Sequence, residues 1–309
     1  MHISITGDLG SGKSTVAKEI CHELNYMYLS TGLIQRQLGI DKGMDTLEFN
    51  KYSDDNKEVD DYIDQKLKDI NYDSNLYVLD SRLAWFFVKN SFKVYLMTID
   101  EVAASRVLTD KKRIGEPLAK DIQSKINDLK ERQRSENNRF KKSYGIEPDI
   151  FRNFDLIIDT STATISEVTS LILTQYKKWQ TKEKFNRLWL SPLRLFPTEN
   201  IRTIAHHEAG SLSEEMTKNG FDDNFPVSCV LCNEDFYLFD GHKRLSAALY
   251  NKLSFIPVQL LAKDLEEVLP SINVIRFVND SLNLSAVYDW EDAHTFKFFH
   301  YPVVLNSAN

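Results

Sequence analysis

Short apolar runs alternate with longer amphipathic stretches through residues 1–184. The apolar runs predict strands at Ile3–Thr6, Tyr26–Leu29, Leu76–Leu79, Lys93–Met97 and Leu156–Ile158. The amphipathic stretches predict helices over Ser14–Leu24, Thr31–Leu38, Glu58–Ile70, Glu101–Leu108, Leu118–Lys142 and Ser166–Lys177. Strands that alternate with helices form βαβ units. The predicted fold class is therefore α/β, with a parallel sheet covered by helices on both faces.

The pattern changes near residue 184. Residues 185–309 mix helices with short strands at Val227–Leu231, Tyr237–Phe239 and Ile256–Leu260, and they hold six of the 8 prolines. We therefore predict two domains, 1–184 and 185–309, of which the second is a smaller α/β or α+β domain. The stretch KKWQTKEKFNRLWLSPL between them reads as a helix end or a linker. Each part is long enough to bury its own core.

Charge and composition exclude several classes of protein. The 309-residue chain has a net charge of −7, and residues 185–309 carry 10 Lys and Arg against 16 Asp and Glu. Such a balance opposes binding to nucleic-acid backbones, so we expect no DNA partner. Apolar runs stay far below membrane-spanning length and no signal peptide is apparent, so we expect no membrane association and a cytoplasmic location. Three cysteines do not make a disulfide framework.

A glycine-rich loop follows the first predicted strand. GDLGSGKS matches the pattern G-x-x-x-x-G-K-[ST], with a strand before it and a helix after it. Backbone N–H groups of such a loop surround phosphate oxygens, and the dipole of the next helix adds positive charge. We predict that Lys13 reaches the β- and γ-phosphates of ATP and that Ser14 binds Mg²⁺. The predicted ATP-binding residues are Gly7, Asp8, Leu9, Gly10, Ser11, Gly12, Lys13, Ser14 and Thr15.

A basic segment lies inside this acidic chain. Residues 106–142 hold 12 Lys and Arg against 6 Asp and Glu. The apolar stripe of the helix there stops after Leu129, and the polar continuation KERQRSENNR predicts a lid over the active site. Phosphoryl transfer needs such positive charge more than covalent chemistry. The candidate catalytic lid residues are Arg106, Arg113, Arg132 and Arg139; the alternative is a solvated basic helix.

Three charged residues follow the second and third predicted strands. Arg36 and Arg82 fall at the carboxyl edge of the sheet, where open α/β folds bind ligands. A guanidinium binds phosphate bidentately, although surface ion pairs are the alternative. Asp80 ends the strand LYVLD, where it is a candidate to bind Mg²⁺ through water or to take a proton from the acceptor. The alternative for Asp80 is a helix N-cap.

These segments resemble the cytidylate kinase family of P-loop kinases. GDLGSGKSTVAKEICHELNYMYLSTGLIQRQL resembles the opening of a cytidylate kinase, with Gly32 and Arg36 in its T-G-x-x-x-R turn. GMDTLEFNKYSDDNKEVDDYIDQKL resembles the nucleotide-binding segment of archaeal-type members, VLDSRLAWFF an acidic-Gly-Arg-Leu turn, and ERQRSENNRFKKSYGIEPDIFRNFDLIIDTS the lid helix and last strand.

The resemblance implies a Mg²⁺-dependent transfer of the γ-phosphate of ATP to a nucleoside monophosphate, with CMP or dCMP as the first candidates. It implies that Arg36 and Arg82 hold the acceptor phosphate and that Asp60 lies near the acceptor nucleoside; a solvated acidic helix face is the alternative for Asp60. Ser81 stands where the family has glycine, and Asp80 where it has glutamate. Another monophosphate, a sugar or an alcohol therefore stays open as the acceptor.

The second part resembles the ParB/sulfiredoxin-like domain. FPTENIR and FYLFDGHKRLSAALYNKLSFIPVQLL carry the resemblance, and Asp240, Gly241, His242, Lys243 and Arg244 form its strand-to-helix turn. Basic groups at a helix N-terminus make a second nucleotide or anion site. In the free-serine-kinase subgroup that this part resembles, Glu199 of Pro-Thr-Glu would be the general base; a module without chemistry is the alternative. Cys229 and Cys232 fit a buried core better than sulfiredoxin or metal chemistry.

Three hypotheses remain at this point. The first is a nucleoside monophosphate kinase fused to a nucleotide-binding domain. The second is a kinase of serine, or of another small hydroxylated metabolite, that acts through the C-terminal part. The third is a nucleotide-gated sensor or interaction protein without transfer. All three predict nucleotides as partners, the kinases add a small-molecule acceptor, and none predicts the oligomeric state.

Overall fold

The structure, a computed structural model, describes residues 1–44, 48–49, 52–53, 56–110, 121–146, 150–201, 206–263 and 273–302. It divides into two compact units, Met1–Glu183 (unit 1) and Lys184–Asn309 (unit 2). The described part of the chain contains no helix with the length and apolarity to cross a membrane.

Unit 1 contains a parallel sheet in the order β2-β3-β1-β4-β5. Its strands are β1 (His2–Gly7), β2 (Met27–Ser30), β3 (Tyr77–Asp80), β4 (Ser91–Met97) and β5 (Leu156–Asp159). Every residue of β1 is buried. This explains its apolar run, because helices cover both faces of a central parallel strand. The predicted α/β class and parallel sheet are confirmed for this part of the chain.

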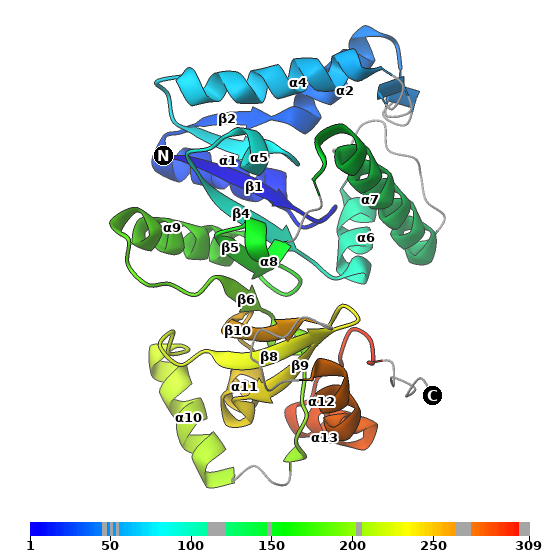
Figure 1. Cartoon of the computed structure of the whole chain (residues 1–309). Helices are drawn as coiled ribbons and strands as arrows, with labels where there is room; N and C mark the ends of the chain where they lie inside the picture. Colours follow the sequence, from blue (N-terminus) through cyan, green and yellow to red (C-terminus); the bar gives the residue numbers. More distant parts are fainter. Residues whose placement is uncertain are drawn as a thin grey trace. The chain divides into compact units, whose positions relative to one another are not determined.

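The helices of unit 1 follow the predicted periodicity with small shifts at their ends. They are α1 (Lys13–Leu24), α2 (Thr31–Asp41), α4 (Lys57–Asp69), α5 (Ala84–Phe87), α6 (Asp100–Thr109), α7 (Ile122–Tyr144), α8 (Ile150–Asn153) and α9 (Ile165–Thr181). In Figure 1, α1 and α9 lie against the sheet and α7 runs beside α6. The one-turn helices α5 and α8 were not predicted, because four residues show no helical period.

The strand order positions the site. Ile5 of β1 pairs with Asp80 at the end of β3, and Gly7 pairs with Leu96 of β4. The carboxyl ends of three neighbouring strands therefore meet at one edge. Chain connections leave β1 and β3 in different directions there, and such a switch point opens a crevice for ligands in α/β folds.

Unit 2 contains a mixed sheet in the order β6-β10-β8-β9-β7. Its strands are β6 (Leu188–Leu190), β7 (Leu195–Phe196), β8 (Val227–Cys232), β9 (Asp235–Asp240) and β10 (Ile256–Lys263). Neither β6 nor β7 was predicted. The stretch interpreted as a helix end or linker contains the end of α9 and then β6, whose three residues are all buried.

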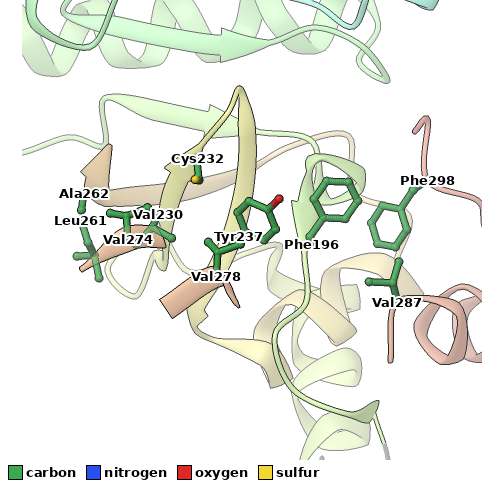
Figure 2. Packing of buried hydrophobic residues seen from close by; sticks show 10 residues of the cluster. All are labelled: Phe196, Val230, Cys232, Tyr237, Leu261, Ala262, Val274, Val278, Val287 and Phe298. Atoms are coloured by element: carbon green, nitrogen blue, oxygen red, sulfur yellow. The ribbon is translucent and has the colours of Figure 1, made fainter. Parts of the chain in front are cut away.

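The helices that the structure describes in unit 2 are α10 (His206–Asn219), α11 (His242–Tyr250), α12 (Val274–Ser281) and α13 (Leu284–His294). Of these, α12 and α13 lie beyond the recognisable sequence motifs. Figure 2 shows the hydrophobic cluster that α12 and α13 help to form: Phe196, Val230, Cys232, Tyr237, Leu261, Ala262, Val274, Val278, Val287 and Phe298. Residues after 272 therefore complete the core of unit 2. Cys229 and Cys232 are buried, as predicted.

Candidate functional site

Three glycines give the loop between β1 and α1 its shape. Gly7, Gly10 and Gly12 have φ angles of 146°, 82° and 89°, in the region that side chains disfavour. A Cβ on Gly7 would lie 2.0 Å from the carbonyl oxygen of Leu96. The loop thus needs glycine both for its backbone angles and for its close approach to β4.

Asp8 fixes this loop to the neighbouring strand. One carboxylate oxygen accepts a hydrogen bond from the Tyr95 hydroxyl at 2.6 Å, and the other accepts from the Thr98 N–H at 2.9 Å. Burial, together with the charge of Asp8, raises the pKa of Tyr95, so this phenol stays a donor. The side chain of Asp8 therefore anchors the loop to β4. The motif predicts a different role for this residue, in which its backbone N–H binds phosphate.

Lys13 lies over the glycine loop. Its Nζ donates to the carbonyl oxygens of Gly7 at 2.9 Å and of Asp8 at 2.5 Å. Burial lowers the pKa of Lys13 to about 7, and the charge of Arg82 adds to this effect. An ammonium with so low a pKa gains from a nearby anion, because the anion favours its charged form.

The carboxylate of Asp80 collects hydroxyl groups beside the loop. Its Oδ2 accepts hydrogen bonds from Ser14 at 2.6 Å, Tyr28 at 3.0 Å and Ser30 at 3.3 Å. Burial, with the charge of Asp80, raises the pKa of Tyr28 to about 12. Ser14 and the following Thr15 are exposed at the first turn of α1. These hard oxygens suit Mg²⁺, which binds one or two carboxylates and takes its other ligands from phosphates and water.

Arg82 follows β3 and reaches the same loop. Its Nη1 donates to the Gly7 carbonyl at 2.5 Å, and its Nε lies 3.0 Å from Oε2 of Glu136 on α7. Its Nη2 is buried and has no hydrogen-bond partner among the described residues. A buried N–H group without a partner is costly, so this atom marks a direction from which a ligand is expected.

The polar face of α7 is turned toward this edge of the sheet. Arg132 Nε lies 3.0 Å from Glu136 Oε1, and Arg139 Nε lies 3.8 Å from Asp60 Oδ2 on α4. The Tyr144 hydroxyl donates to Asp64 of α4 at 2.7 Å. Glu136 contacts Arg82, which follows β3, and Arg139 contacts Asp60 of α4, so these two charged residues are half-buried rather than solvated. The role of α7 as a lid stays a prediction.

The remaining predicted residues of unit 1 lie in different surroundings. Arg106 of α6 donates to the carbonyl oxygen of Thr160 at 2.6 Å, and the Thr160 hydroxyl donates to Ser11 of the loop at 3.0 Å. Arg36 is exposed on α2 and makes no hydrogen bond or ion pair with the part of the chain that the structure describes. Arg113 lies outside the described residues. The structure therefore joins Arg82, Arg132 and Glu136 directly, but not Arg36.

The predicted anion turn of unit 2 has a different bonding pattern. Gly241 caps α11 with a φ of 105°, and a Cβ there would lie 2.7 Å from Val227 Cγ1. Arg244 donates to the carbonyl oxygens of Phe225 at 2.6 Å and Pro226 at 2.9 Å. Its Nη2 bonds to Asp240 at 2.8 Å. Within the turn Arg244 thus binds protein atoms, while Lys243 is half-buried beside it.

Glu199 and His242 meet in unit 2. Glu199 Oε1 lies 3.5 Å from His242 Nδ1, and the Thr198 N–H donates to His242 Nε2 at 3.3 Å. The Thr198 hydroxyl lies 3.1 Å from the same ring nitrogen. Burial lowers the pKa of His242. A cavity of about 680 Å³ adjoins Thr198 and is lined by Thr198, Asn200, Asp280, Ser281, Leu282, Asn283, Leu284 and Ala286.

Comparison with known proteins identifies the first part of the chain. The family described as an AAA domain matches residues 3–128. A cytidylate kinase from Archaeoglobus fulgidus is 35% identical over 187 residues, which cover 60% of this chain and 100% of the relative. The chain belongs to the cytidylate kinase family. A second cytidylate kinase, from Methanocaldococcus jannaschii, is 36% identical over 173 residues, or 56% of this chain and 95% of the relative.

A third relative is a longer protein. The S-adenosylmethionine-dependent nucleotide dehydratase of Lacinutrix mariniflava is 35% identical over 178 residues, which cover 57% of this chain and 36% of the relative. This chain therefore matches about a third of that dehydratase. The kinase relatives confirm the predictions of a phosphotransferase and of ATP use. None of these matches bears on the ParB/sulfiredoxin-like resemblance of unit 2.

Sequence reasoning missed three residues of the site. Glu136 was counted only as part of a polar helix, although it stands four residues after Arg132 and three before Arg139, on one helix face. Tyr28 and Ser30 are two positions apart on β2, so their side chains lie on the same side of the strand, where both hydroxyls donate to Asp80. The helical spacing was the available signal for Glu136. No comparable signal marked the two hydroxyls, because they depend on the pairing of β2 with β3.

Proposed function

We propose that unit 1 transfers the γ-phosphate of ATP to a nucleoside monophosphate, with CMP or dCMP as the first candidates. The observation that carries this proposal is the shared carbonyl of Gly7, which accepts from Lys13 at 2.9 Å and from Arg82 at 2.5 Å. The donor-side lysine and an acceptor-side arginine thus meet at one atom of the phosphate loop. Phosphoryl transfer requires this proximity of two phosphate-binding groups.

The residues of the site have different roles in phosphoryl transfer. The loop N–H groups and Lys13 bind the phosphates of ATP, and Arg82, with Arg36, binds the acceptor phosphate. Ser14 and Asp80 would hold Mg²⁺, which supplies neutralising charge to the phosphates when bound. An acceptor phosphate oxygen forms the new bond to the γ-phosphorus, and the bond to the bridging oxygen breaks as ADP leaves. Arg106 and Arg132 add positive charge around this group.

Within the same proposal, unit 2 is a ParB/sulfiredoxin-like domain that binds a nucleotide or another anion. Its support is the turn from β9 to α11, in which Gly241 adopts a left-handed conformation at the first turn of a helix. His242 and Lys243 begin that helix. Helix N-termini of this kind favour negative charge.

Phosphate transfer from ATP to a panel of monophosphates tests the function of unit 1. CMP, dCMP, UMP, AMP and GMP should be compared with serine as a non-nucleotide acceptor. We expect turnover of at least one pyrimidine monophosphate, its loss by about 100-fold or more in Lys13→Ala, and no change in Lys177→Ala on the exposed face of α9. Turnover of none of CMP, dCMP and UMP would overturn the cytidylate proposal.

A second candidate function is a kinase of serine or another small hydroxylated metabolite in unit 2. The observation that favours it is the pairing of Glu199 with His242 at 3.5 Å beside the cavity that Thr198 lines. A carboxylate in contact with imidazole has the chemistry of a general base.

Separate variants of the two units distinguish these functions. If the second candidate holds, Glu199→Gln abolishes transfer to serine and Lys13→Ala leaves that transfer intact. Glu215→Gln, an exposed position on α10, is the matched control. Loss of every transfer activity in Lys13→Ala alone would eliminate this second site. Binding of ATP and CTP by the wild type without any transfer would instead favour a nucleotide-gated sensor.

A further inference from the structure

Glu136 lies among the cations of the site. It projects from the lid helix α7, with Oε2 at 3.0 Å from Arg82 Nε and Oε1 at 3.0 Å from Arg132 Nε. Its side chain is 16% exposed, whereas that of Asp128, on the same helix, is 53% exposed. One buried carboxylate thus joins the lid to the arginine that follows β3.

The charge of Glu136 needs an explanation. Burial alone raises the pKa of a carboxyl group, yet Arg82 and Arg132 outweigh burial and hold the pKa of Glu136 below its ordinary value. Glu136 is therefore ionised in a site that binds anions. A fixed negative charge repels phosphate, so it reduces affinity unless it improves the arrangement of the cations around it.

The geometry shows what this carboxylate arranges. It contacts both arginines through Nε, the inner edge of each guanidinium. In Arg82, Nη1 donates a hydrogen bond to the Gly7 carbonyl. Its Nε forms an ion pair with Glu136 Oε2 at 3.0 Å, without the geometry of a hydrogen bond, so two of the three nitrogens have a protein partner. The third, Nη2, is buried without a hydrogen-bond partner among the described residues. A guanidinium fixed at two nitrogens presents the third in one direction and loses little further entropy when it binds a ligand.

We propose that Glu136 is a positioning residue for the acceptor phosphate. Its carboxylate fixes Arg82 and Arg132 by their Nε edges and thereby holds Nη2 of Arg82 ready for a phosphate oxygen of the acceptor. This proposal rests on the proposed function of unit 1, because the acceptor monophosphate is the ligand in both. The opposite role, in which Glu136 occupies the phosphate position until the acceptor displaces it, predicts tighter acceptor binding when the charge is removed.

Steady-state kinetics of Glu136→Gln, Glu136→Asp and Glu131→Gln test the proposal. Glu131 is an exposed acid of the same helix and serves as the matched control. We expect Glu136→Gln to raise KM for the acceptor by about tenfold or more, with KM for ATP within about twofold of the wild type. Glu136→Asp should restore part of the loss, because it keeps the charge. Thermal melting of each variant checks that the fold is retained.

A double-mutant cycle separates positioning from a general structural role. In an Arg82→Ala background, Glu136→Gln should reduce kcat/KM by a clearly smaller factor than it does in the wild type, because one of the two arginines on which it acts is gone. Equal kinetics of Glu136→Gln and Glu131→Gln, a lowered KM for the acceptor, or full additivity in the cycle would each overturn the role of Glu136. A wild type that turns over none of the monophosphates would overturn the proposed function, and this proposal with it. The two failures are distinguishable, since only the second abolishes wild-type activity.

Discussion

The depressed pKa of Lys13 leads to a pH dependence of nucleotide binding. Burial lowers this pKa to about 7, so much of the lysine is uncharged just above neutral pH. Bound phosphate favours the ammonium form and raises the pKa in the complex. Nucleotide affinity should therefore be greatest below the pKa of the unliganded protein and should fall as the pH rises above it.

The size of the effect follows from the fraction of charged lysine. With a pKa of about 7, this fraction is ~9% at pH 8 and ~1% at pH 9, as a single titration requires. If the pKa in the complex stays above 9, the association constant falls about tenfold between these pH values, or ~1.4 kcal/mol. Phosphate groups have their second pKa near ~6, so their charge hardly changes in this range.

Isothermal titration calorimetry with ADP at pH 8.0, 8.5 and 9.0 measures this dependence without any transfer reaction. Lys13→Arg is the control, because a guanidinium keeps its charge throughout this range. The wild type should lose affinity with pH and take up protons on binding, whereas Lys13→Arg should show a flat profile. An equally flat profile in the wild type would refute the inference that Lys13 is half-charged near neutrality.

Three further substitutions test the fold and the site. Gly7→Ala should lower the melting temperature by several °C or abolish folding, because its Cβ would meet the Leu96 backbone; Gly210→Ala, in open space on α10, should not. Asp80→Asn should lower kcat by about 100-fold and raise the Mg²⁺ concentration needed for half-maximal activity, while the melting temperature stays nearly unchanged. The same Mg²⁺ dependence in the variant as in the wild type would contradict this role of Asp80. Phe196→Ala should cost about 3–5 kcal/mol of unfolding free energy, against little for exposed Phe225→Ala, as chemical denaturation can measure.

Local patterns predicted the sheet of unit 1 and its phosphate loop. The glycines of the loop were recognisable because their spacing reflects positive φ angles, which few other residues tolerate. The apolar run at Ile3–Thr6 was equally clear, since a strand buried on both faces holds few charged side chains.

Features that depend on distant contacts were not predictable in the same way. The two-residue strand β7 exists because Leu195 and Phe196 pair with β9, far along the chain. Val278 and Val287 belong to helices whose sequences carry no motif, yet both are fully buried in the core of unit 2. The contact of Glu136 with Arg82 likewise joins residues more than fifty positions apart, so sequence spacing contained no sign of it.

The two units share a backbone device but use it differently. Each has a strand followed by a glycine in the left-handed region and then a helix, with Gly12 before α1 and Gly241 before α11. Lys13, directly after Gly12, bonds only to uncharged oxygens of its own loop in the contacts that the structure describes. Arg244, in contrast, has its charge balanced by Asp240. In the turn of unit 1, a phosphate therefore meets a lysine that no described carboxylate contacts directly. In the turn of unit 2, a phosphate would have to compete with Asp240 for Arg244. This difference supports the assignment of phosphoryl transfer to unit 1.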